Sequence, residues 1–575
     1  MIYKKAGAGL FTALPATSDE FLPWTWTQIE TYYHDLENRP LNAVALNGWM
    51  ADWSALTSLI EESYHRLEVA TAQNTTDEQA VKSYHSFLEH IYQPAETEEQ
   101  KLKQKLLQSG LEPDNFFIPL RNLRAEADLF REANVPLNFE EHKLSSDYDK
   151  IIGAQTVEWE GKEVTISQLA PYYLLDDRHL REKAWTLASR RQLADRAAIN
   201  ELWGKFLRLR RQKAANAGLP DFREYRWRQM LRFDYTPADC ASFQQAILKV
   251  VVPAAVKIYE KRRRRLGYPT LRPWDLEVDP LKRTPLRPFT QADELQNGTS
   301  RIFHRLDPEL GRYFDVMRKE NLLDLDNRKG KAPGGFCTGF EVRRRPFILM
   351  NAVGLDNDLY TLLHESGHAF HVFESAHLPY IQQWRVGMEF AEVASMAMEL
   401  LAAPYLQAEQ GGFYADNDMA RSRIEHLEKN ILFWPYMAVV DSFQHWVYAN
   451  PEAASDPVQC DKKWGEQWDQ YMPGVDWSGL EEAKITGWHR KLHIHHYPFY
   501  YVEYGLAQLG AALVWRNSLR DRRAALTAYR QALGVGGTAP LPQLYAAAGA
   551  RFAFDVSALQ EAVELMLSTI ETLEK

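Results

Sequence analysis

The segment Thr361-Leu-Leu-His364-Glu365-Ser-Gly-His368-Ala-Phe-His371 carries the pattern His-Glu-x-x-His. If this segment is helical, His364 and His368 lie one turn apart on the same face. Two imidazoles in that arrangement can bind one cation of the size and softness of Zn²⁺. Glu365 is rotated by about 100° from His364 around the helix axis. It therefore lies beside the ion, where a general base can take a proton from a metal-activated water molecule.

The residues that flank this pattern are apolar on nearly every side, which indicates a buried helix. They are Leu362, Leu363, Ala369, Phe370, Val372 and Phe373. Two ordinary histidines and a glutamate on a helix without a metal are the alternative interpretation. A buried cluster of these residue types is costly unless its polar groups are paired. A bound cation removes that cost, so the sequence favours a metal site.

A catalytic zinc site usually has three protein ligands and one open position for water, so a third ligand must come from elsewhere. His371 lies on the same helix face, but it is two turns from His364, about 10 Å along the axis, which is too far to share one ion. We interpret His371 as a residue that supports a ligand or faces the substrate. The extended pattern with a later glycine and a third histidine is absent, because His371 and Glu374 occupy those two positions.

A second helix is expected over Gly387 to Leu401, and it carries several carboxylates. Glu389, Glu392 and Glu399 fall on one broad face of this helix, among apolar residues. An acidic stripe within an apolar helix indicates a cation next to it, although a solvated charged face gives the same pattern. Helix geometry alone does not choose among the three glutamates, so each is a candidate third ligand.

Two short β-prone segments precede the His-Glu-x-x-His helix, Phe336 to Val342 and Pro346 to Asn351. Three arginines separate them, and together they predict an antiparallel pair. The exposed edge of such a pair can bind an extended peptide through backbone hydrogen bonds, whereas a purely structural hairpin is the alternative. Cys337 lies in the first segment, and we expect it to be an inert small residue. A further hairpin is predicted over Gln155 to Ser167, around Glu160-Gly161.

Helical periodicity dominates the rest of the chain. The helices expected before and after the predicted hairpin cover Trp24 to Leu36, Leu41 to Ala70, Asp77 to Ile91, Glu98 to Leu107, Asp177 to Arg191 and Ala197 to Ala217. Because the hairpin marks a boundary, we expect an N-terminal helical part over residues 1–165 and a catalytic part over residues 166–575. The predicted fold class is mainly α, with a small antiparallel β-sheet beside the metal-binding helix.

The composition is that of an ordinary globular protein. The chain has 575 residues, of which 45% are hydrophobic and 25% charged, and 67 Lys and Arg against 77 Asp and Glu give a formal net charge of −10. This acidic balance argues against a nucleic-acid partner, which would require a basic surface. We interpret the basic run Lys261 to Arg265 as the solvated end of a helix. An uninterrupted apolar run of about 18 residues does not occur, so we expect no membrane partner.

The sequence has three cysteines, Cys240, Cys337 and Cys460, at widely separated positions. This count argues against a secreted disulfide scaffold and is typical of a reducing cytosol. The N-terminal Lys4-Lys5 and the residues from Ala6 to Ala16 resemble a signal peptide only weakly, because Gly, Thr and Pro interrupt the apolar stretch. We therefore expect a cytoplasmic protein.

His364-Glu-Ser-Gly-His368-Ala-Phe-His371, followed by Phe390-Ala-Glu392-Val-Ala-Ser395 and Glu399, resembles the M3 family of zinc metallopeptidases. The chain length and the segment Pro346-Phe-Ile-Leu-Met-Asn351 are most similar to the oligoendopeptidase F and Pz-peptidase branch. The resemblance extends over about residues 165 to 570, with a weaker match in the N-terminal helices. It implies that Glu392 is the third zinc ligand and that Glu399 orients a ligand histidine. One departure is Ala394, where many relatives have proline, and it does not touch a ligand.

The segment His493-Ile-His-His-Tyr-Pro-Phe-Tyr-Tyr-Val-Glu-Tyr504 is rich in His and Tyr. Its proline suits the first turn of a helix, in which Tyr500 and Tyr504 would share a face. A tyrosine hydroxyl or a protonated histidine can stabilise the oxyanion that forms in peptide hydrolysis. Aromatic packing in the core is the alternative for each of these residues. The family resemblance favours His493 and Tyr500 as the oxyanion donors, and Tyr497 and Tyr504 as further substrate-binding residues.

The resemblance implies a zinc-dependent endopeptidase that holds one Zn²⁺ per chain and cleaves short peptides in a deep substrate channel. A narrow channel would admit unfolded oligopeptides and exclude folded proteins. Glu365 would take a proton from the attacking water and pass it to the leaving amine. Co²⁺ or Mn²⁺ could replace zinc in the same ligand set. We expect a monomer or a small homo-oligomer.

Two other functions fit part of the pattern. A zinc carboxypeptidase or aminopeptidase would use the same ligands but would require a free peptide terminus. A non-catalytic peptide-binding protein would use the metal only for stability, in a closed site with four protein ligands. Glu365 argues against this last alternative, because a structural metal site has no use for a base.

Overall fold

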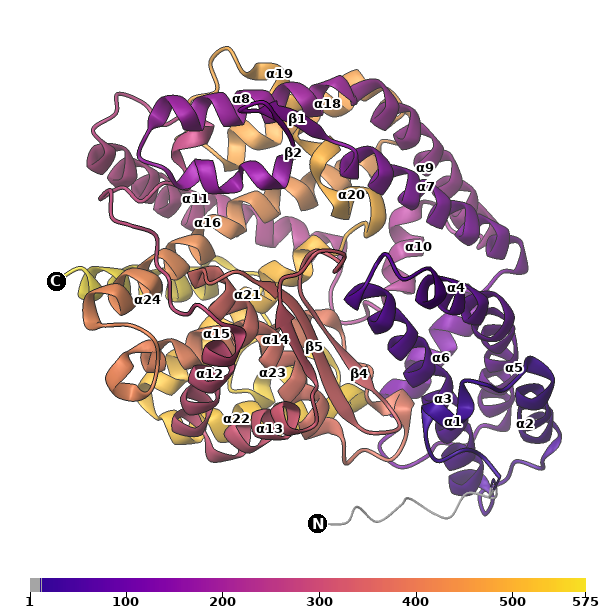
Figure 1. Ribbon diagram of the computed structural model, residues 1–575. Coiled ribbons are helices and arrows are strands. Elements are labelled where there is room, and N and C mark those ends of the chain that lie inside the picture. The colour runs from indigo at the N-terminus through magenta and orange to yellow at the C-terminus, as the bar shows by residue number, and fades with distance from the viewer. Residues whose placement is uncertain (1–10, 12) are drawn as a thin grey trace. The chain divides into compact units, whose positions relative to one another are not determined.

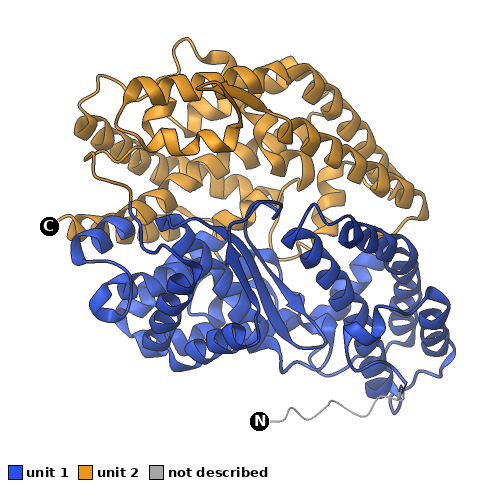
Figure 2. Ribbon diagram, viewed as in Figure 1, with its two compact units in different colours: residues 1–128, 286–423, 507–552 blue, residues 129–285, 424–506, 553–575 orange. Residues whose placement is uncertain are grey.

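The computed structural model describes residue 11 and residues 13–575, and the chain is mainly helical (Figure 1). It divides into two compact units, each made of segments that are far apart in the sequence (Figure 2). Unit 1 comprises residues 1–128, 286–423 and 507–552, and unit 2 comprises residues 129–285, 424–506 and 553–575. Two of the five points at which the chain passes from one unit to the other lie within the long helices α16 (Asp416–Ala449) and α21 (Tyr501–Arg520). The division into residues 1–165 and 166–575 stays a prediction.

Unit 1 contains helices from both ends of the chain. These are α1 (Ser18–Phe21), α2 (Trp26–Asn38), α3 (Leu46–Gln73), α4 (Glu78–Phe87), α5 (Gln93–Ser109), α6 (Phe117–Leu129), α12 (Ala292–Leu306), α13 (Pro308–Lys319), α14 (Asp356–Ser375), α15 (Met388–Ala402), α22 (Arg522–Val535) and α23 (Leu541–Ala547). A π-helical turn, Leu88–Tyr92, joins α4 to α5. The helices predicted between residues 24 and 107 are present, with ends that differ by up to five residues from the prediction.

A three-stranded sheet lies against α14 in unit 1. Its strands are β3 (Leu323–Asp326), β4 (Phe336–Phe340) and β5 (Arg345–Ala352), in the order β3-β5-β4. β4 pairs with β5 in antiparallel fashion, which confirms the predicted pair. β3 pairs with β5 in parallel. This third strand was not predicted, because half of its residues are aspartates, which are depleted from strands.

Helix α14 carries the His-Glu-x-x-His pattern and packs against β4, β5, α15 and α22. Its contact with α15 is close because Gly367 has no side chain. A Cβ at that position would lie 2.4 Å from the carbonyl oxygen of Ala394 and 2.6 Å from Cα of Ser395. Both are backbone atoms in a packed helix and cannot move aside on their own. Gly367 therefore sets the spacing between the two helices on which the predicted metal ligands lie.

Unit 2 is built from helices and a β-hairpin. Its helices are α7 (Val135–Gly153), α8 (Arg178–Ala194), α9 (Arg196–Asn216), α10 (Phe222–Gln229), α11 (Pro237–Leu266), α17 (Pro451–Ala454), α18 (Pro457–Tyr471), α19 (Glu481–Ile485), α20 (Leu492–His496) and α24 (Val556–Leu573). The hairpin pairs β1 (Thr156–Trp159) with β2 (Lys162–Thr165) in antiparallel fashion, as predicted. The basic run ends α11, where Lys261 and Arg265 both pair with Glu574.

One helix in the described part of the chain, α11, is long and apolar enough to cross a membrane by length and composition. Half of its most apolar window is buried inside the protein, and the core helices of globular proteins pass the same test. A single helix of this kind is weak evidence for a membrane span. Most of the N-terminal stretch considered as a signal peptide lies outside the described residues, because residues 1–10 and 12 are not among them.

We predict that Gly367→Ala lowers the free energy of unfolding by about 1–3 kcal/mol, because the added methyl group must push α15 away from α14. Chemical denaturation followed by circular dichroism measures this change. The matched control is Gly48→Ala on α3, where a Cβ meets no atom within 4 Å. That substitution should stabilise the protein by up to about 1 kcal/mol. Equal stability of the two variants would contradict the close packing of α14 on α15.

Candidate metal centre

Hydrogen bonds to Asp358 fix the start of helix α14. The Asp358 carboxylate accepts the backbone N–H groups of Val353, at 2.7 Å, and Leu355, at 2.9 Å. An acidic side chain is favourable here because it lies at the positive end of the helix dipole. Since β5 ends directly before this turn, the sheet and the cap together fix the direction of α14.

Three side chains from α14 and α15 converge in unit 1. The ligand atoms of His364, His368 and Glu392 all lie within 4.8 Å of one another. Glu392 Oε2 is 3.3 Å from His364 Nε2 and 3.6 Å from His368 Nε2. The centroids of the two imidazole rings are 5.1 Å apart, and the rings are nearly perpendicular. Two histidines and one carboxylate gathered in this way are a donor set suited to one zinc ion.

The charges around these residues favour a cation. Burial raises the pKa of Glu392, but the neighbouring His368 and His364 outweigh it and lower that pKa to about 2. Burial lowers the pKa of His364, but the hydrogen bonds and charges of Glu392 and Glu399 outweigh it and raise that pKa well above its usual value. Two carboxylates around one imidazole therefore stabilise positive charge at this point. A divalent cation supplies that charge, so the residues present fit the predicted zinc ion.

Two further side chains hold the donors in position. Glu399 Oε1 lies 2.6 Å from Nδ1 of His364, while Nε2 of the same ring faces Glu392. A carboxylate on the far nitrogen of a ligand histidine fixes the orientation and tautomer of the ring. Ser395 is fully buried and donates a 2.8 Å hydrogen bond to Glu392 Oε2. Ser395 had no predicted role, and its spacing of three residues after Glu392 is the signal that could have found it.

Glu365 lies on α14 next to His364 but is not one of the three converging residues. It is 7% exposed, and burial raises the pKa of its carboxyl to about 7. The backbone N–H of Cys337, on β4, donates a hydrogen bond to this carboxylate. The edge of the sheet thus positions the predicted base. Burial and the Glu365 charge raise the pKa of the Cys337 thiol, in line with the inert role expected for it.

Two other predicted residues lie outside the converging group. Glu389 is 3% exposed and lies one turn before Glu392 on α15, but the geometry brings only Glu392 to the histidines. His371 is 7% exposed, and its ring packs edge-on against Phe390 with centroids 6.0 Å apart. Burial lowers the pKa of His371 to about 4. His371 is not among the three converging residues, as expected from its distance of two helical turns from His364. Its role in substrate binding stays a prediction.

The predicted His and Tyr residues of the C-terminal segment form a cluster within unit 2. Four aromatic rings have centroids 4.9–6.3 Å from the ring of His493, those of Tyr497, Tyr500, Tyr501 and Tyr504. Tyr501 is the nearest and had no predicted role. Its hydroxyl accepts a 2.7 Å hydrogen bond from Lys491.

Two features of this cluster differ from the prediction. Burial, together with the charges of Lys491 and His496, lowers the pKa of His493 to about 4. The ring is therefore neutral at neutral pH rather than protonated, and it can donate only one N–H. Helix α21 begins at Tyr501, after a turn in which Phe499 has a φ of 66°, so Tyr500 precedes the helix. The sequence pattern predicts the start of the helix at the proline at position 498. A proline does not indicate that the next residue, Phe499, adopts a left-handed conformation.

Comparisons with known proteins give a consistent result. The sequence model of peptidase family M3 matches residues 172–564 of this chain. The oligoendopeptidase F homolog of Borreliella burgdorferi is 21% identical over 298 residues, which cover 50% of this chain and 48% of that protein. The oligopeptidase PepF of Bacillus subtilis is 36% identical over 102 residues, which cover 17% of this chain and 15% of that protein. The chain thus aligns with about half the length of the first relative and a smaller part of the second.

Solved structures are similar over nearly the whole chain. A crystal structure assigned as an oligoendopeptidase F has 26% identity and a TM-score of 0.87, and the match covers 97% of this chain and 99% of that one. Pz peptidase A with an inhibitor has 27% identity and a TM-score of 0.85, and the match covers 98% of this chain and 99% of that one. The mainly helical fold with small sheets is therefore shared with these proteins, as predicted.

We predict that Glu392→Ala lowers the zinc content of the purified protein by one ion per chain, because only two imidazole donors are left. Glu399→Gln should weaken zinc binding at the same centre about 10- to 100-fold, because the His364 ring loses its carboxylate partner. Elemental analysis after dialysis against a competing chelator measures both effects. The matched control is Glu389→Gln on the same helix, which should keep the wild-type zinc content. If Glu389→Gln loses zinc while Glu392→Ala keeps the wild-type zinc content, Glu389 and not Glu392 is the third ligand.

Proposed function

The chain belongs to peptidase family M3, and on that premise we propose that it is a zinc-dependent endopeptidase that hydrolyses internal peptide bonds of short oligopeptides. The observation that carries this proposal is the position of Glu365, a buried carboxylate held by the Cys337 backbone next to three converging donors. A metal that only stabilised the fold would have no use for such a residue. Hydrolysis by a metal-activated water does use a proton acceptor of this kind.

In this proposal His364, His368 and Glu392 hold the zinc ion. Zinc bound by these residues would polarise the scissile carbonyl and make a water molecule more acidic. Glu399 keeps the His364 ring oriented, and Ser395 keeps the Glu392 carboxylate oriented. Because both contacts exist before a substrate binds, the donors need no reorganisation during the reaction.

Glu365 is the proposed general base. It accepts a proton from the attacking water while the water oxygen bonds to the carbonyl carbon of the peptide. It then donates that proton to the nitrogen of the leaving amine as the C–N bond breaks. The hydrogen bond from Cys337 links this carboxylate to strand β4, which lies at the edge of its sheet. A peptide in extended form can add to such an edge, so we propose β4 as the strand on which the substrate docks.

We propose His493 and Tyr500 as hydrogen-bond donors to the oxyanion, and Tyr497, Tyr504 and His371 as substrate contacts. The family resemblance and the grouping of the tyrosines around His493 support these roles. Tyr497 is 50% exposed, so it is open to a ligand. A narrow substrate channel that admits short unfolded peptides is part of the same proposal.

We also propose a cytoplasmic location and a monomer or small homo-oligomer. The location is supported by the three cysteines in 575 residues, a low count for a secreted protein that depends on disulfides. Short peptides are the proposed partners, and no nucleic acid or membrane partner is proposed.

We predict that Glu365→Gln keeps the bound zinc but lowers kcat at least about 10²-fold, because an amide cannot accept the proton. An internally quenched peptide reports the rate, and zinc content is measured in parallel. The matched control is Glu374→Gln on the same helix, where the carboxylate pairs with Arg530 at 2.6 Å. This control should turn over near the wild-type rate. Substantial residual turnover by Glu365→Gln would overturn the assignment of the base.

We predict that Tyr500→Phe lowers kcat about 10²- to 10³-fold with little change in KM, because the lost donor acts mainly in the transition state. Steady-state kinetics with the same peptide separate the two parameters. The control is Tyr501→Phe, the adjacent residue, whose hydroxyl contacts Lys491 instead. A wild-type kcat in Tyr500→Phe would remove this tyrosine from the mechanism.

We predict that a short peptide with both termini blocked is cleaved at an internal bond, and mass spectrometry of the products identifies that bond. A carboxypeptidase or aminopeptidase would leave the blocked peptide intact, because it requires a free terminus. A ladder of longer peptides should show an upper length limit. Efficient digestion of casein would contradict the narrow channel while leaving the endopeptidase assignment in place.

A further inference from the structure

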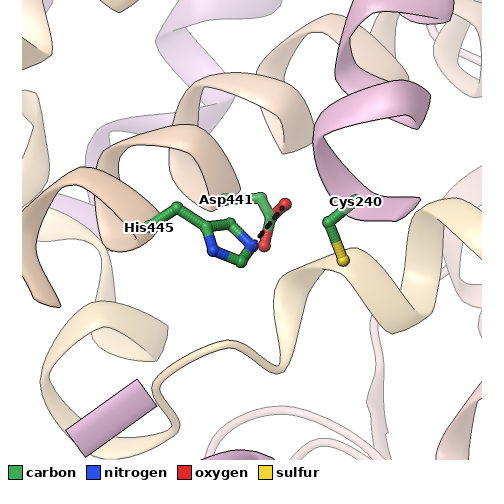
Figure 3. Close-up of side chains that lie close together, drawn as sticks. All are labelled: Cys240, Asp441 and His445. Atoms are coloured by element: carbon green, nitrogen blue, oxygen red, sulfur yellow. Dashed lines mark ion pairs between the residues drawn. The ribbon is translucent and has the colours of Figure 1, made fainter. Parts of the chain in front are cut away.

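Cys240, Asp441 and His445 form a cluster within unit 2 that contains none of the residues proposed for the metallopeptidase site (Figure 3). Cys240 and Asp441 are buried, and His445 is partly buried. Their ligand atoms, a sulfur, a carboxylate oxygen and a ring nitrogen, all lie within 4.8 Å of one another. Figure 3 shows the Asp441 carboxylate between the His445 ring and the Cys240 thiol. We propose that these three residues bind a second divalent transition-metal ion, of which zinc is the best match. This proposal does not depend on the peptidase assignment.

The three side chains of the cluster come from two helices, and the residues on each helix lie on a single face. Cys240 and Gln244 are one turn apart near the start of α11, and Asp441 and His445 are one turn apart on α16. Gln244 donates a 2.7 Å hydrogen bond to Asp441 Oδ2. The face of α11 that carries the thiol therefore also holds the carboxylate in place. Such mutual support of donors is typical of metal sites.

Asp441 has a polar atom without a partner. The residue is fully buried, and its Oδ1 makes no hydrogen bond although Oδ2 is bonded to Gln244. A buried carboxylate oxygen without a partner costs free energy, because it has lost its hydration without compensation. A cation bound beside Oδ1 would remove this cost.

His445 contributes a second unpartnered atom. Its Nε2 is buried and makes no hydrogen bond, and it lies 3.6 Å from Asp441 Oδ2, which is beyond hydrogen-bond range. A neutral imidazole nitrogen has a lone pair that a metal ion can bind. The unpartnered Nε2 therefore suits a bound cation.

The donor types indicate the kind of ion. Sulfur, nitrogen and oxygen donors together suit zinc, whereas Mg²⁺ and Ca²⁺ take oxygen ligands. The same residue types can also activate a nucleophilic thiol, but Cys240 and Asp441 are fully buried, so a substrate does not reach the sulfur. Another group of possible ligands, His34, Glu37 and Glu98, has two exposed members and no comparable unpartnered carboxylate, so it carries no proposal.

An ion at this position would join α11 to α16 within unit 2. A metal that binds the folded state and not the unfolded state adds to stability. The metal content would then be two ions per chain, rather than the one that the family resemblance implies. Removal of the second ion should lower the melting temperature even when the metallopeptidase centre has been disabled.

The test uses Co²⁺ as the probe, because a cysteine thiolate bound to Co²⁺ gives a charge-transfer absorption band that nitrogen and oxygen donors do not give. The full-length protein loaded with Co²⁺ is compared with Cys240→Ser and with the matched control Cys460→Ser. Cys460 is also buried in unit 2, but its sulfur lies 3.3 Å from the Ala454 carbonyl oxygen and outside the cluster. We expect the band in the wild type and the control, and its loss in Cys240→Ser. Absence of the band from the wild type, or its survival in Cys240→Ser, would overturn the proposal.

Zinc counting separates this cluster from the metallopeptidase centre. The double variant His364→Ala, His368→Ala should retain one equivalent of zinc, and adding Cys240→Ser should remove it. Complete loss of zinc from the double variant would overturn the proposal, whatever the peptidase assays show.

If circular dichroism shows that Cys240→Ser is misfolded, His445→Phe replaces it, because it keeps an aromatic ring against Phe499 and removes the nitrogen donor. In His445→Phe we again expect loss of the second zinc ion and a weaker or absent Co²⁺–thiolate absorption band.

Discussion

The close contact between α14 and α15 is the constraint on which the proposed metal centre depends. The two histidines lie on one helix and the glutamate on the other, so the donors converge only while the helices keep their spacing. Gly367 permits that spacing, because a side chain there would meet the backbone of α15. The Tyr529 hydroxyl, from α22, donates a 2.7 Å hydrogen bond to the Ala394 carbonyl oxygen that faces Gly367. Close packing within unit 1 thus fixes the spacing of the proposed donors.

Burial and charge have opposite effects on the pKa values of the residues at the proposed metal centre. Carboxylates and imidazoles that are removed from water prefer their neutral forms. In unit 1 the negative charges of Glu392 and Glu399 outweigh this preference around His364, whereas burial dominates at Glu365. The pKa of Glu392 is therefore lowered while that of Glu365 is raised. Two carboxyl groups with such different pKa values suit the two proposed roles, a metal ligand and a proton acceptor.

The sequence predicts contacts within one element better than contacts between elements. The helices and both antiparallel pairs follow from periodicity, whereas the parallel strand β3 joins a distant segment and was missed. The spacing of His364 and His368 was enough to pair them, because helix geometry is regular. The choice of Glu392 over Glu389 needed the family resemblance, since only packing distinguishes them. The neutral state of His493 and the cluster of Cys240, Asp441 and His445 also arise from tertiary packing, which residue spacing does not encode.

The most direct measurement of the metal centre is zinc-edge anomalous diffraction from crystals of the full-length protein grown with zinc. We expect an anomalous peak about 2.0–2.2 Å from Nε2 of His364, Nε2 of His368 and the Glu392 carboxylate, with the Glu365 carboxylate beside the ion and not bound to it. Zinc peaks at other positions, with none between these three donors, would contradict the proposed centre.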